Sequence, residues 1–357
     1  MHVPSKFSLL LLALICSIPA LGQERKSYGI RTVAFYNVEN LFDTQNDSAT
    51  YDDNRTPTGK DRWTDGRYRQ KIAYISRVIS EIGVQTTKTS PDVIGLCEVE
   101  NRRVLEDLVQ HPNLVQRDYG IIHYDSPDER GIDVALLYRK SSFIPHSFDS
   151  RRLLLFNAEG HRDYTRDQLV VSGLLDEEQL YFIVNHWPSR SGGEARSRPY
   201  RLAAAQLNRR IMDSLIQQDP EAKIISMGDL NDDPQDTSLK KVLKTSGSKV
   251  VNDTLLENIS LFNPMEKLFR KGLGSLAYRD QWNLFDQIFF TTNLLHPNKE
   301  TFRFWKAGIF DVPYLRTQKG RYKGYPLRTY AGGQYVGGYS DHFPVYIYLI
   351  REVVPKL

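Results

Sequence analysis

Cysteine is scarce in this sequence, with two residues in a chain of 357. Cys16 lies in an apolar N-terminal segment, and Cys97 ends the apolar run at 93–97. If the N-terminal segment is removed, the single remaining thiol excludes an internal disulfide. We expect Cys97 to be a buried core residue rather than a nucleophile, because its neighbours are apolar. Stability must then come from the hydrophobic core and from bound ions.

A strong net charge and a biased composition are also absent. The formal net charge is +4, which does not mark a general nucleic-acid binder, although a local basic patch can still exist. Hydrophobic residues make up 40% and charged residues 25% of the chain, as in ordinary globular proteins. No internal repeat, low-complexity block or long linker interrupts residues 23–357. We therefore expect a single domain over 23–357.

Long hydrophobic runs are limited to the N-terminus. Lys6 precedes an apolar run at 7–16, and small residues follow at 20–22. This pattern predicts a signal peptide at 1–22 that is cleaved before Gln23, and so an exported protein that is periplasmic or secreted. The run is shorter than the roughly 20 residues needed to cross a bilayer, so we expect no membrane anchor.

The rest of the chain alternates short apolar runs with turn signals. Three helices are predicted: one over the isoleucine stripe at 72–82, one at 199–217, and one that begins after Asn263-Pro264. Runs rich in β-branched and aromatic residues predict strands at 31–36, 92–97, 119–124, 132–138, 168–175, 179–185, 222–228, 285–291, 301–306 and 343–350. Many strands with few helices predict packed sheets that are flanked by helices.

Polar side chains gather at the ends of these predicted strands. The densest case is GDLND (228–232), where Asp229 and Asn231 are two residues apart and would share one face of an extended chain. The alternative interpretation is a strand that ends in a polar turn. If the strand ends lie side by side, one pocket collects Asn37, Glu39, Glu98, His186, Asp229, Asn231, Asp286, Asp341 and His342.

This set of side chains has a recognisable chemistry. Carboxylates and an amide without cysteine suit a hard divalent cation, Mg²⁺ first and Mn²⁺ or Ca²⁺ as alternatives, rather than zinc. Two histidines and an aspartate beside such an ion could hold a phosphoryl group and activate water. Each residue taken alone also has a structural explanation, as a solvated strand-end charge, a turn residue or a packed histidine.

In their order along the chain, the motifs resemble those of the endonuclease/exonuclease/phosphatase superfamily, which includes pancreatic-type deoxyribonucleases, abasic-site endonucleases, bacterial sphingomyelinases and inositol polyphosphate phosphatases. The resemblance covers 29–350. The motifs are FYNVENLF (35–42), IGLCEVEN (94–101), RGIDVALLYR (130–139), IVNHWPSR (183–190), GDLND (228–232), FDQIFF (285–290) and SDHFPV (340–345). The resemblance implies a four-layer α/β sandwich of two facing mixed sheets flanked by helices, with the pocket at one end.

The resemblance also implies which residues hold the cation. Glu98 falls at the position of the principal metal ligand of the family. Asn37 and Asp341 match positions that assist it, and Glu39 falls where some members use a second acid.

For the chemical step, the resemblance implies one role for each of the remaining five residues. His186 matches a histidine that contacts the scissile phosphate in several branches. Asp229 would orient or deprotonate the attacking water, and Asn231 would donate to a phosphate oxygen. His342 would pair with the phosphate or the water, while Asp286 would fix the tautomer of its ring.

A long insertion at 308–339 precedes the last motif and is rich in glycine and tyrosine. Its cations interleave with tyrosines, which is the composition of a surface that binds a phosphate backbone and stacks bases. From this pattern we predict Arg321, Lys323 and Arg328 as substrate-binding residues, and we add Arg190 because it lies close to His186. The alternative is a packed aromatic loop with solvated charges.

Together these observations predict a divalent-metal-dependent phosphoesterase, and most specifically an endonuclease or phosphodiesterase that acts on nucleic acid. One alternative is a phospholipid hydrolase of the sphingomyelinase kind or an inositol- or sugar-phosphate phosphatase. The sequence shows no long hydrophobic hairpin for membrane docking, which disfavours the phospholipid substrate. A second alternative is a non-catalytic binding protein on the same fold. We expect a monomer.

Overall fold

The protein is described by a computed structural model that covers residues 27–248 and 261–353. The predicted signal peptide at 1–22 lies outside the described residues. In the part of the chain that is described, no helix is both long enough and apolar enough to cross a membrane.

Six strands form the first sheet, called sheet A, in the order β16-β19-β1-β2-β4-β3. They are β1 (Ser27–Leu41), β2 (Val93–Val99), β3 (Tyr119–His123), β4 (Asp133–Arg139), β16 (Arg303–Ile309) and β19 (Val345–Val353). Strand β1 runs parallel to β2 and antiparallel to β19, so sheet A is mixed.

Seven strands form the second sheet, called sheet B, in the order β11-β12-β15-β10-β9-β8-β5. They are β5 (Phe143–Arg151), β8 (Gln168–Leu175), β9 (Glu178–His186), β10 (Ile224–Asp229), β11 (Thr245–Ser246), β12 (Leu261–Phe262) and β15 (Asp286–Thr291). Strand β10 runs parallel to β9 and antiparallel to β15, so sheet B is mixed as well.

Helices and short hairpins complete the fold. The helices are α1 (Asp65–Glu81), α2 (Val84–Thr87), α3 (Arg102–Gln110), α4 (Glu194–Gln218) and α5 (Met265–Phe269). Short helical turns are η1 (Asp53–Arg55), η2 (Val115–Arg117), η3 (Ser238–Val242), η4 (Thr292–Leu295) and η5 (Pro313–Leu315). Three small hairpins pair β6 (Leu155–Phe156) with β7 (Arg162–Asp163), β13 (Leu276–Tyr278) with β14 (Gln281–Asn283), and β17 (Tyr330–Ala331) with β18 (Gln334–Tyr335).

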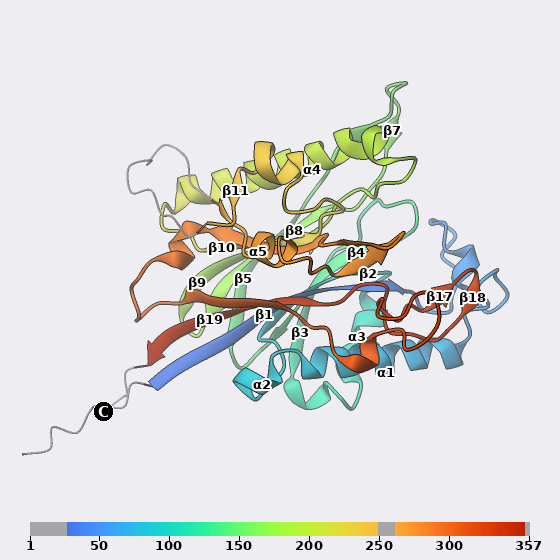
Figure 1. Ribbon diagram of the computed structural model, residues 1–357, viewed down its shortest axis with the longest axis horizontal. Helices are drawn as coiled ribbons and strands as arrows, with labels where there is room; N and C mark the ends of the chain where they lie inside the picture. The colour runs from blue at the N-terminus through green and yellow to red at the C-terminus, as the bar shows by residue number, and fades with distance from the viewer. Residues whose placement is uncertain (1–26, 249–260, 354–357) are drawn as a thin grey trace, which may run out of the picture.

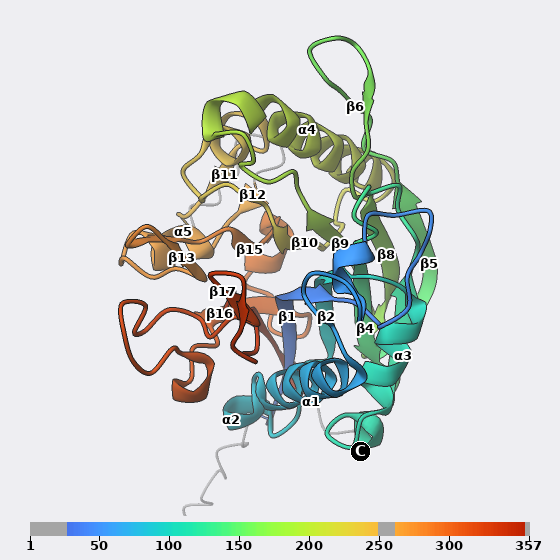
Figure 2. The ribbon, with the colours of Figure 1, turned by 90° about the vertical axis from the view of Figure 1, so that its right-hand side faces the viewer.

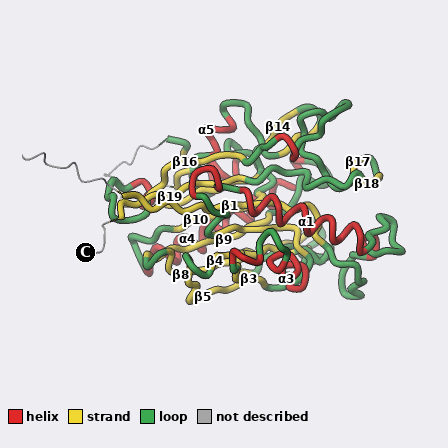
Figure 3. The backbone as a smooth tube through the Cα atoms, turned by 90° about the horizontal axis from the view of Figure 1, so that it is seen from below, coloured by secondary structure: helices red, strands yellow, loops and turns green. Residues whose placement is uncertain are grey.

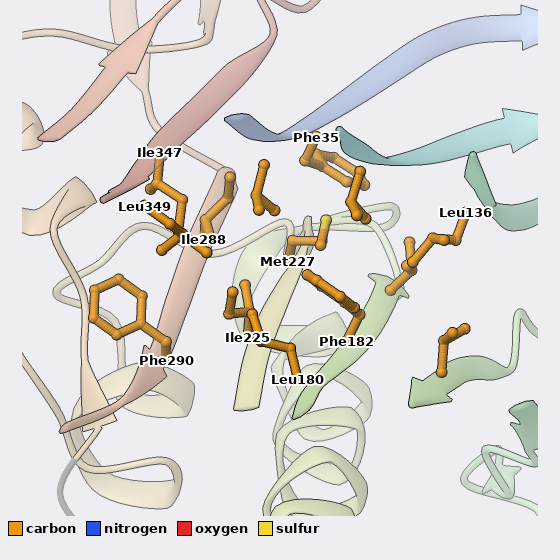
Figure 4. Packing of buried hydrophobic residues seen from close by; sticks show 14 of the residues in the cluster. Phe35, Leu136, Leu180, Phe182, Ile225, Met227, Ile288, Phe290, Ile347 and Leu349 are labelled. Atoms are coloured by element: carbon orange, nitrogen blue, oxygen red, sulfur yellow. The ribbon is translucent and has the colours of Figure 1, made fainter. Parts of the chain in front are cut away.

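The two sheets pack face to face because their inner faces carry apolar side chains at every second position. On β9, Phe182 and Val184 belong to the core between the sheets, whereas Ile183 belongs to the core on the outer face of sheet B. Figure 4 shows the inner core, where Met227 and Ile225 of β10 lie near Phe182 and Ile288. This packing fixes the position of one sheet relative to the other.

Helices cover the outer faces of both sheets and complete four layers. Isoleucines of α1 and leucines of α3 pack on the outer face of sheet A, and residues such as Met212 of α4 pack on sheet B. Figure 1 shows α4 above the sheets and α1 below them, and Figure 3 shows α1 from its own side of the molecule. The predicted four-layer α/β sandwich is therefore confirmed.

Each of the ten predicted strands is present, within three residues at most boundaries. The chain also has strands that the sequence patterns did not predict, because β5 is an exposed edge strand and the small hairpins are only two or three residues a side. Helix α3 was likewise missed, and α4 begins at Glu194 rather than at 199. The hairpin β6–β7 projects beyond α4 and exposes Leu154 and Phe156, a short apolar feature that the sequence analysis did not find (Figure 2).

Gly95 of β2 tests how tightly the sheets pack. A Cβ at this position would lie 2.8 Å from Met227 Sδ and 3.0 Å from Val184 Cγ1, both of sheet B. Gly95→Ala should therefore lower the free energy of unfolding by about 1–3 kcal/mol in urea denaturation. The matched control is Gly66→Ala in the first turn of α1, where the added Cβ would lie 3.8 Å from Thr64 Oγ1. The control should be neutral or stabilising by up to about 1 kcal/mol, and equal losses in both variants would contradict close packing at Gly95.

Candidate active site

The nine polar residues that the sequence analysis selected lie at one end of the two sheets. Parallel pairing aligns Asp229 of β10 with His186 of β9, and antiparallel pairing aligns the same residue with Asp286 of β15. In sheet A, Asn37 of β1 pairs with Cys97 of β2, directly before Glu98. Strand pairing thus brings residues that are far apart in sequence to the same edge, as predicted.

Asn37 and Asp229 connect the ends of the two sheets. The Asn37 Nδ2 donates to Asp229 Oδ2 over 3.0 Å, and both side chains are buried. The other oxygen of Asp229 accepts from the backbone N of Asn231 at 3.0 Å. Burial raises the pKa of Asp229 to about 6, although the neighbouring His342 opposes the shift. Asp229 is therefore a rigidly held carboxylate with a pKa suited to receiving a proton.

Local distortions of β1 and β2 aim two acids at the pocket. The pairing register shifts between Asn37 and Leu41 on β1 and between Cys97 and Val99 on β2. Within these bulges Glu39 has φ +50° and Glu98 has φ +62°, a conformation that is uncommon for residues other than glycine. The Glu98 Oε2 accepts from the backbone N of Asn40 at 2.9 Å. A bulge that turns a carboxylate out of the sheet is typical of functional sites.

A buried lysine faces these acids. Lys71 of α1 is 2% exposed, and its Nζ donates to Thr329 Oγ1 and to the Tyr339 carbonyl, both at 2.7 Å. Its Nζ lies 3.9 Å from Glu39 Oε2. Burial lowers the pKa of Lys71 to about 8 against the charges of Glu39, Asp341 and Glu98, which favour its ammonium form. The three carboxylates thus share one electrostatic environment.

Arg328 forms an ion pair with Asp341 on the acidic side of the pocket. Arg328 donates to Asp341 Oδ2 over 2.5 Å, and its Nε lies 3.8 Å from Glu39 Oε1. Burial alone would raise the pKa of Asp341, but the charges of His342 and Arg328 hold it below its ordinary value. For Glu39, burial outweighs the positive charges of Lys71 and Arg328 and raises the pKa to about 7.

His342 and Asp286 form the second connection between the sheets. The His342 Nδ1 lies 2.6 Å from Asp286 Oδ2, which also accepts from Ser275 Oγ at 2.5 Å. The other ring nitrogen of His342 lies 4.0 Å from Asp229 Oδ2. Burial lowers the pKa of His342, but the charge of Asp286 and its hydrogen bond outweigh burial and raise the pKa well above the ordinary value. The geometry is that of a histidine whose Nδ1 is fixed and whose Nε2 faces the pocket.

His186 differs from His342 in its charge state. Its Nε2 lies 3.8 Å from Asp229 Oδ2 and 3.9 Å from Glu98 Oε1, while its Nδ1 is a buried atom without a hydrogen-bond partner among the described residues. Burial and the charges of Arg166 and Arg130 lower its pKa well below the ordinary value. The lowered pKa favours the neutral imidazole form of His186, in which one ring nitrogen donates and the other accepts.

The donor set at this end of the sheets fits a hard divalent cation. Glu98 and Asp341 would contribute carboxylate oxygens and Asn37 an amide oxygen, which are the hard oxygen ligands that Mg²⁺ prefers. A second candidate group consists of Asp229, Asp286 and His342, whose potential ligand atoms lie within 4.8 Å of one another. In that group the His342 Nδ1 already bonds Asp286, so these residues are better suited to hold a proton than an ion.

Two grooves lie near the candidate site, and the first of them includes one of its residues. The first, of about 750 Å³, is bounded by loop 190–194, the hairpin β13–β14 and segment 325–328, and it reaches Asp341. The second, of about 910 Å³, lies between the hairpin β6–β7 and the start of α4. It includes Arg130 and Arg166, the two arginines that act on His186. Gly192 lines both grooves, so they meet at the loop before α4.

The predicted substrate-binding residues occupy different positions. Arg328 lies at the acids, as described, whereas Arg321 packs over the ring of Tyr322 and Lys323 is exposed. Arg190 bonds the Asn231 carbonyl at 2.8 Å and lines the first groove. Their contact with substrate remains a prediction.

Asn231 is already partly engaged within the protein. Its Nδ2 donates to the Trp187 carbonyl at 3.0 Å, and its backbone is held at φ +50°. An amide nitrogen carries two hydrogens, so one hydrogen bond to a phosphate oxygen remains available. Its role at phosphate also remains a prediction.

Several residues that hold the site in place were not predicted from the sequence. Lys71 lies four residues before Ile75, on the apolar stripe of α1, and a lysine on such a stripe could have indicated a buried charge. Asp232, inside the GDLND motif, pairs with the buried Arg201 at 2.6 Å. Asp233 accepts from the Leu284 backbone N at 2.7 Å. The crowding of acids after β10 therefore serves two purposes, since Asp232 and Asp233 fix the loop while Asp229 faces the pocket.

Known proteins share this sequence profile and this fold. The profile of the Endonuclease/Exonuclease/phosphatase family matches residues 32–351. No curated protein matches the chain.

Several solved structures have a similar fold. A humanized D. rerio TDP2 is 14% identical with a TM-score of 0.53, covering 90% of this chain and 98% of that chain. An endonuclease/exonuclease/phosphatase family protein of Bacteroides thetaiotaomicron is 18% identical with a TM-score of 0.53, covering 91% and 96%. The mannosyl-6-phosphatase Bt3783 of the same organism is 19% identical with a TM-score of 0.52, covering 89% and 99%. At these identities the similarity shows the fold alone.

The contact between Asp286 and His342 can be tested by titration. In metal-free protein, NMR should show that His342 keeps its proton at neutral pH, because Asp286 raises its pKa. Asp286→Asn should move the titration of His342 down by at least one pH unit. The unfolded imidazole has a pKa of about 6.5, so the stability from this pair is full below that pH and is lost as pH rises through the folded pKa. An unchanged titration in the variant would show that Asp286 does not act on His342.

Proposed function

Because the chain belongs to the endonuclease/exonuclease/phosphatase family, we propose that it hydrolyses phosphoesters with the help of a divalent cation, and that its substrate is a phosphodiester in nucleic acid. The proposal rests on the family, on the acidic and histidine residues at one end of the sheets, and on the two grooves. Glu98, Asp341 and Asn37 would hold the cation, with Glu39 as a second acid. A bound cation would neutralise charge on the phosphate.

The side chains of this protein supply the remaining functions. Asp229 would orient the attacking water and accept its proton, because its pKa of about 6 leaves it ionised at neutral pH. His342 in its protonated form would donate from Nε2 to a phosphate oxygen, and Asp286 holds the ring in that orientation. His186 and Asn231 would add neutral donors where negative charge develops. In this proposal Asp229 accepts the proton, and His342, His186 and Asn231 donate hydrogen bonds.

The single observation that favours a phosphodiester is that the groove at Asp341 continues at Gly192 into a second groove, between the hairpin β6–β7 and the start of α4. A terminal phosphate needs room for one alcohol, whereas a phosphate within a chain needs an extended groove for the rest of the strand. The first groove carries Tyr278, Arg279 and Tyr325, and the second carries Tyr164, Arg130 and Arg196. Aromatic rings and arginines in both grooves suit bases and backbone phosphates of a single strand.

A second candidate is the phosphate ester of a sugar. It is favoured by the similar fold of the B. thetaiotaomicron mannosyl-6-phosphatase. It also draws on the polar lining of the first groove, where Gln281 and Asn283 could bond hydroxyl groups. This candidate uses the same catalytic residues and differs only in what fills the grooves.

A substrate panel separates these candidates. Purified protein with Mg²⁺ should cleave single-stranded DNA or RNA with a higher kcat/KM than sphingomyelin, inositol phosphates or mannose 6-phosphate. Faster hydrolysis of mannose 6-phosphate would establish the sugar phosphatase instead. Hydrolysis of none of these substrates with any divalent cation would favour a binding protein.

The role of Glu98 needs a separate test. Glu98→Gln should lower kcat/KM by roughly 10²-fold or more and weaken Mg²⁺ binding, because a neutral amide replaces the anionic ligand. The matched control is Glu100→Gln, two residues later, where the side chain bonds the Asp43 backbone N rather than facing the pocket. The control should keep its activity, because an amide oxygen can still accept that bond. Full activity and full Mg²⁺ affinity in Glu98→Gln would remove Glu98 from the site.

A further inference from the structure

The acidic cluster consists of Glu39, Glu98 and Asp341. Two side chains from different segments, Lys71 and Arg328, offset its negative charge, and they are held in very different ways. Lys71 is buried and tied by two hydrogen bonds to Thr329 and Tyr339. The Arg328 side chain is 49% exposed. The groove of about 750 Å³ is lined by both Arg328 and Asp341. Lys71 is thus a fixed counter-ion, whereas Arg328 has solvent-accessible space into which it can move.

Arg328 and a divalent cation would compete for the negative charge of Asp341, where Arg328 bonds one of the two carboxylate oxygens. The guanidinium lies 2.5 Å from Asp341 Oδ2 and 3.8 Å from Glu39 Oε1. Mg²⁺ needs its ligand oxygens at roughly 2.0–2.1 Å, and it repels a guanidinium at the same carboxylate. Asp341 therefore binds a cation more weakly while Arg328 occupies its Oδ2 and neutralises its charge.

We propose that Arg328 is an exchangeable counter-ion, which neutralises Asp341 in the metal-free protein and turns to the substrate phosphate when a divalent cation takes its place. This inference rests on the proposed function. A guanidinium presents a planar pair of donors that matches two phosphate oxygens, so Arg328 is well suited to the second position. The groove that it lines supplies the path between the two positions.

This exchange makes cation and phosphate binding cooperative. The cation releases Arg328 from Asp341, and a bound phosphate keeps Arg328 away from that carboxylate. Each ligand therefore favours binding of the other, and by thermodynamic linkage the two enhancements are equal. Arg328 would act as a binding residue for substrate and as a regulator of metal affinity.

Titration calorimetry without any substrate tests the inference, with Mg²⁺ and inorganic phosphate as the probes. Arg328→Ala should bind Mg²⁺ about tenfold more tightly than wild type, because a positive charge at the site is removed. In saturating Mg²⁺, the same variant should bind phosphate about tenfold more weakly. Wild type should show tighter phosphate binding with Mg²⁺ than without it, and Arg328→Ala should lose most of that enhancement.

The matched control is Arg316→Ala, which removes an arginine of the same segment that bonds Asp311 instead of the site acids, and it should leave both affinities unchanged. Weaker Mg²⁺ binding by Arg328→Ala would overturn the inference, since it would mean that Arg328 only positions Asp341. Unchanged affinities for both probes would overturn it as well. Wild-type protein that binds no divalent cation would refute the proposed function together with this inference, whereas the other two failures leave the proposed function intact.

Discussion

The hydrogen bond from Asn37 to Asp229 joins the ends of two different sheets, and the candidate site depends on it. Together with the contact between His342 and Asp286, it places acids and a histidine from both sheets around one point. Neither contact can form unless the sheets pack at a fixed distance and in a fixed register. The core between the sheets sets that distance, and it does so with close contacts such as those around Gly95. The chemistry at the strand ends is thus a consequence of packing far inside the molecule.

Much of this arrangement could be predicted from the sequence. Buried strands such as β2 and β10 were predicted correctly because their apolar runs are short and end in polar residues. The gathering of Asp229, His186 and Asp286 followed from strand pairing alone. By contrast, the edge strand β5 alternates too little to be predicted, and the contacts of Lys71 join segments more than 250 residues apart. Local patterns carry no information about such tertiary contacts.

Charge balance explains why so many acids can share a small space. Glu39, Glu98 and Asp341 would repel one another if they stood alone, and burial would add a desolvation penalty. Lys71 and Arg328 offset both costs, and the opposite shifts of the Glu39 and Asp341 pKa values show how unevenly they do so. The positive partners therefore belong to the site as much as the acids do. The two histidines differ for a similar reason, since carboxylates raise the pKa of His342 while burial, together with two arginines, lowers that of His186.

We propose that the candidate site is divided between residues that hold a cation and residues that move a proton. The most direct test is a crystal structure with Mn²⁺, in which anomalous scattering locates the ion. We expect a peak bounded by Glu98 and Asp341, with the His342 Nδ1 still bonded to Asp286. A peak between Asp229, Asp286 and His342, with that hydrogen bond broken, would contradict it.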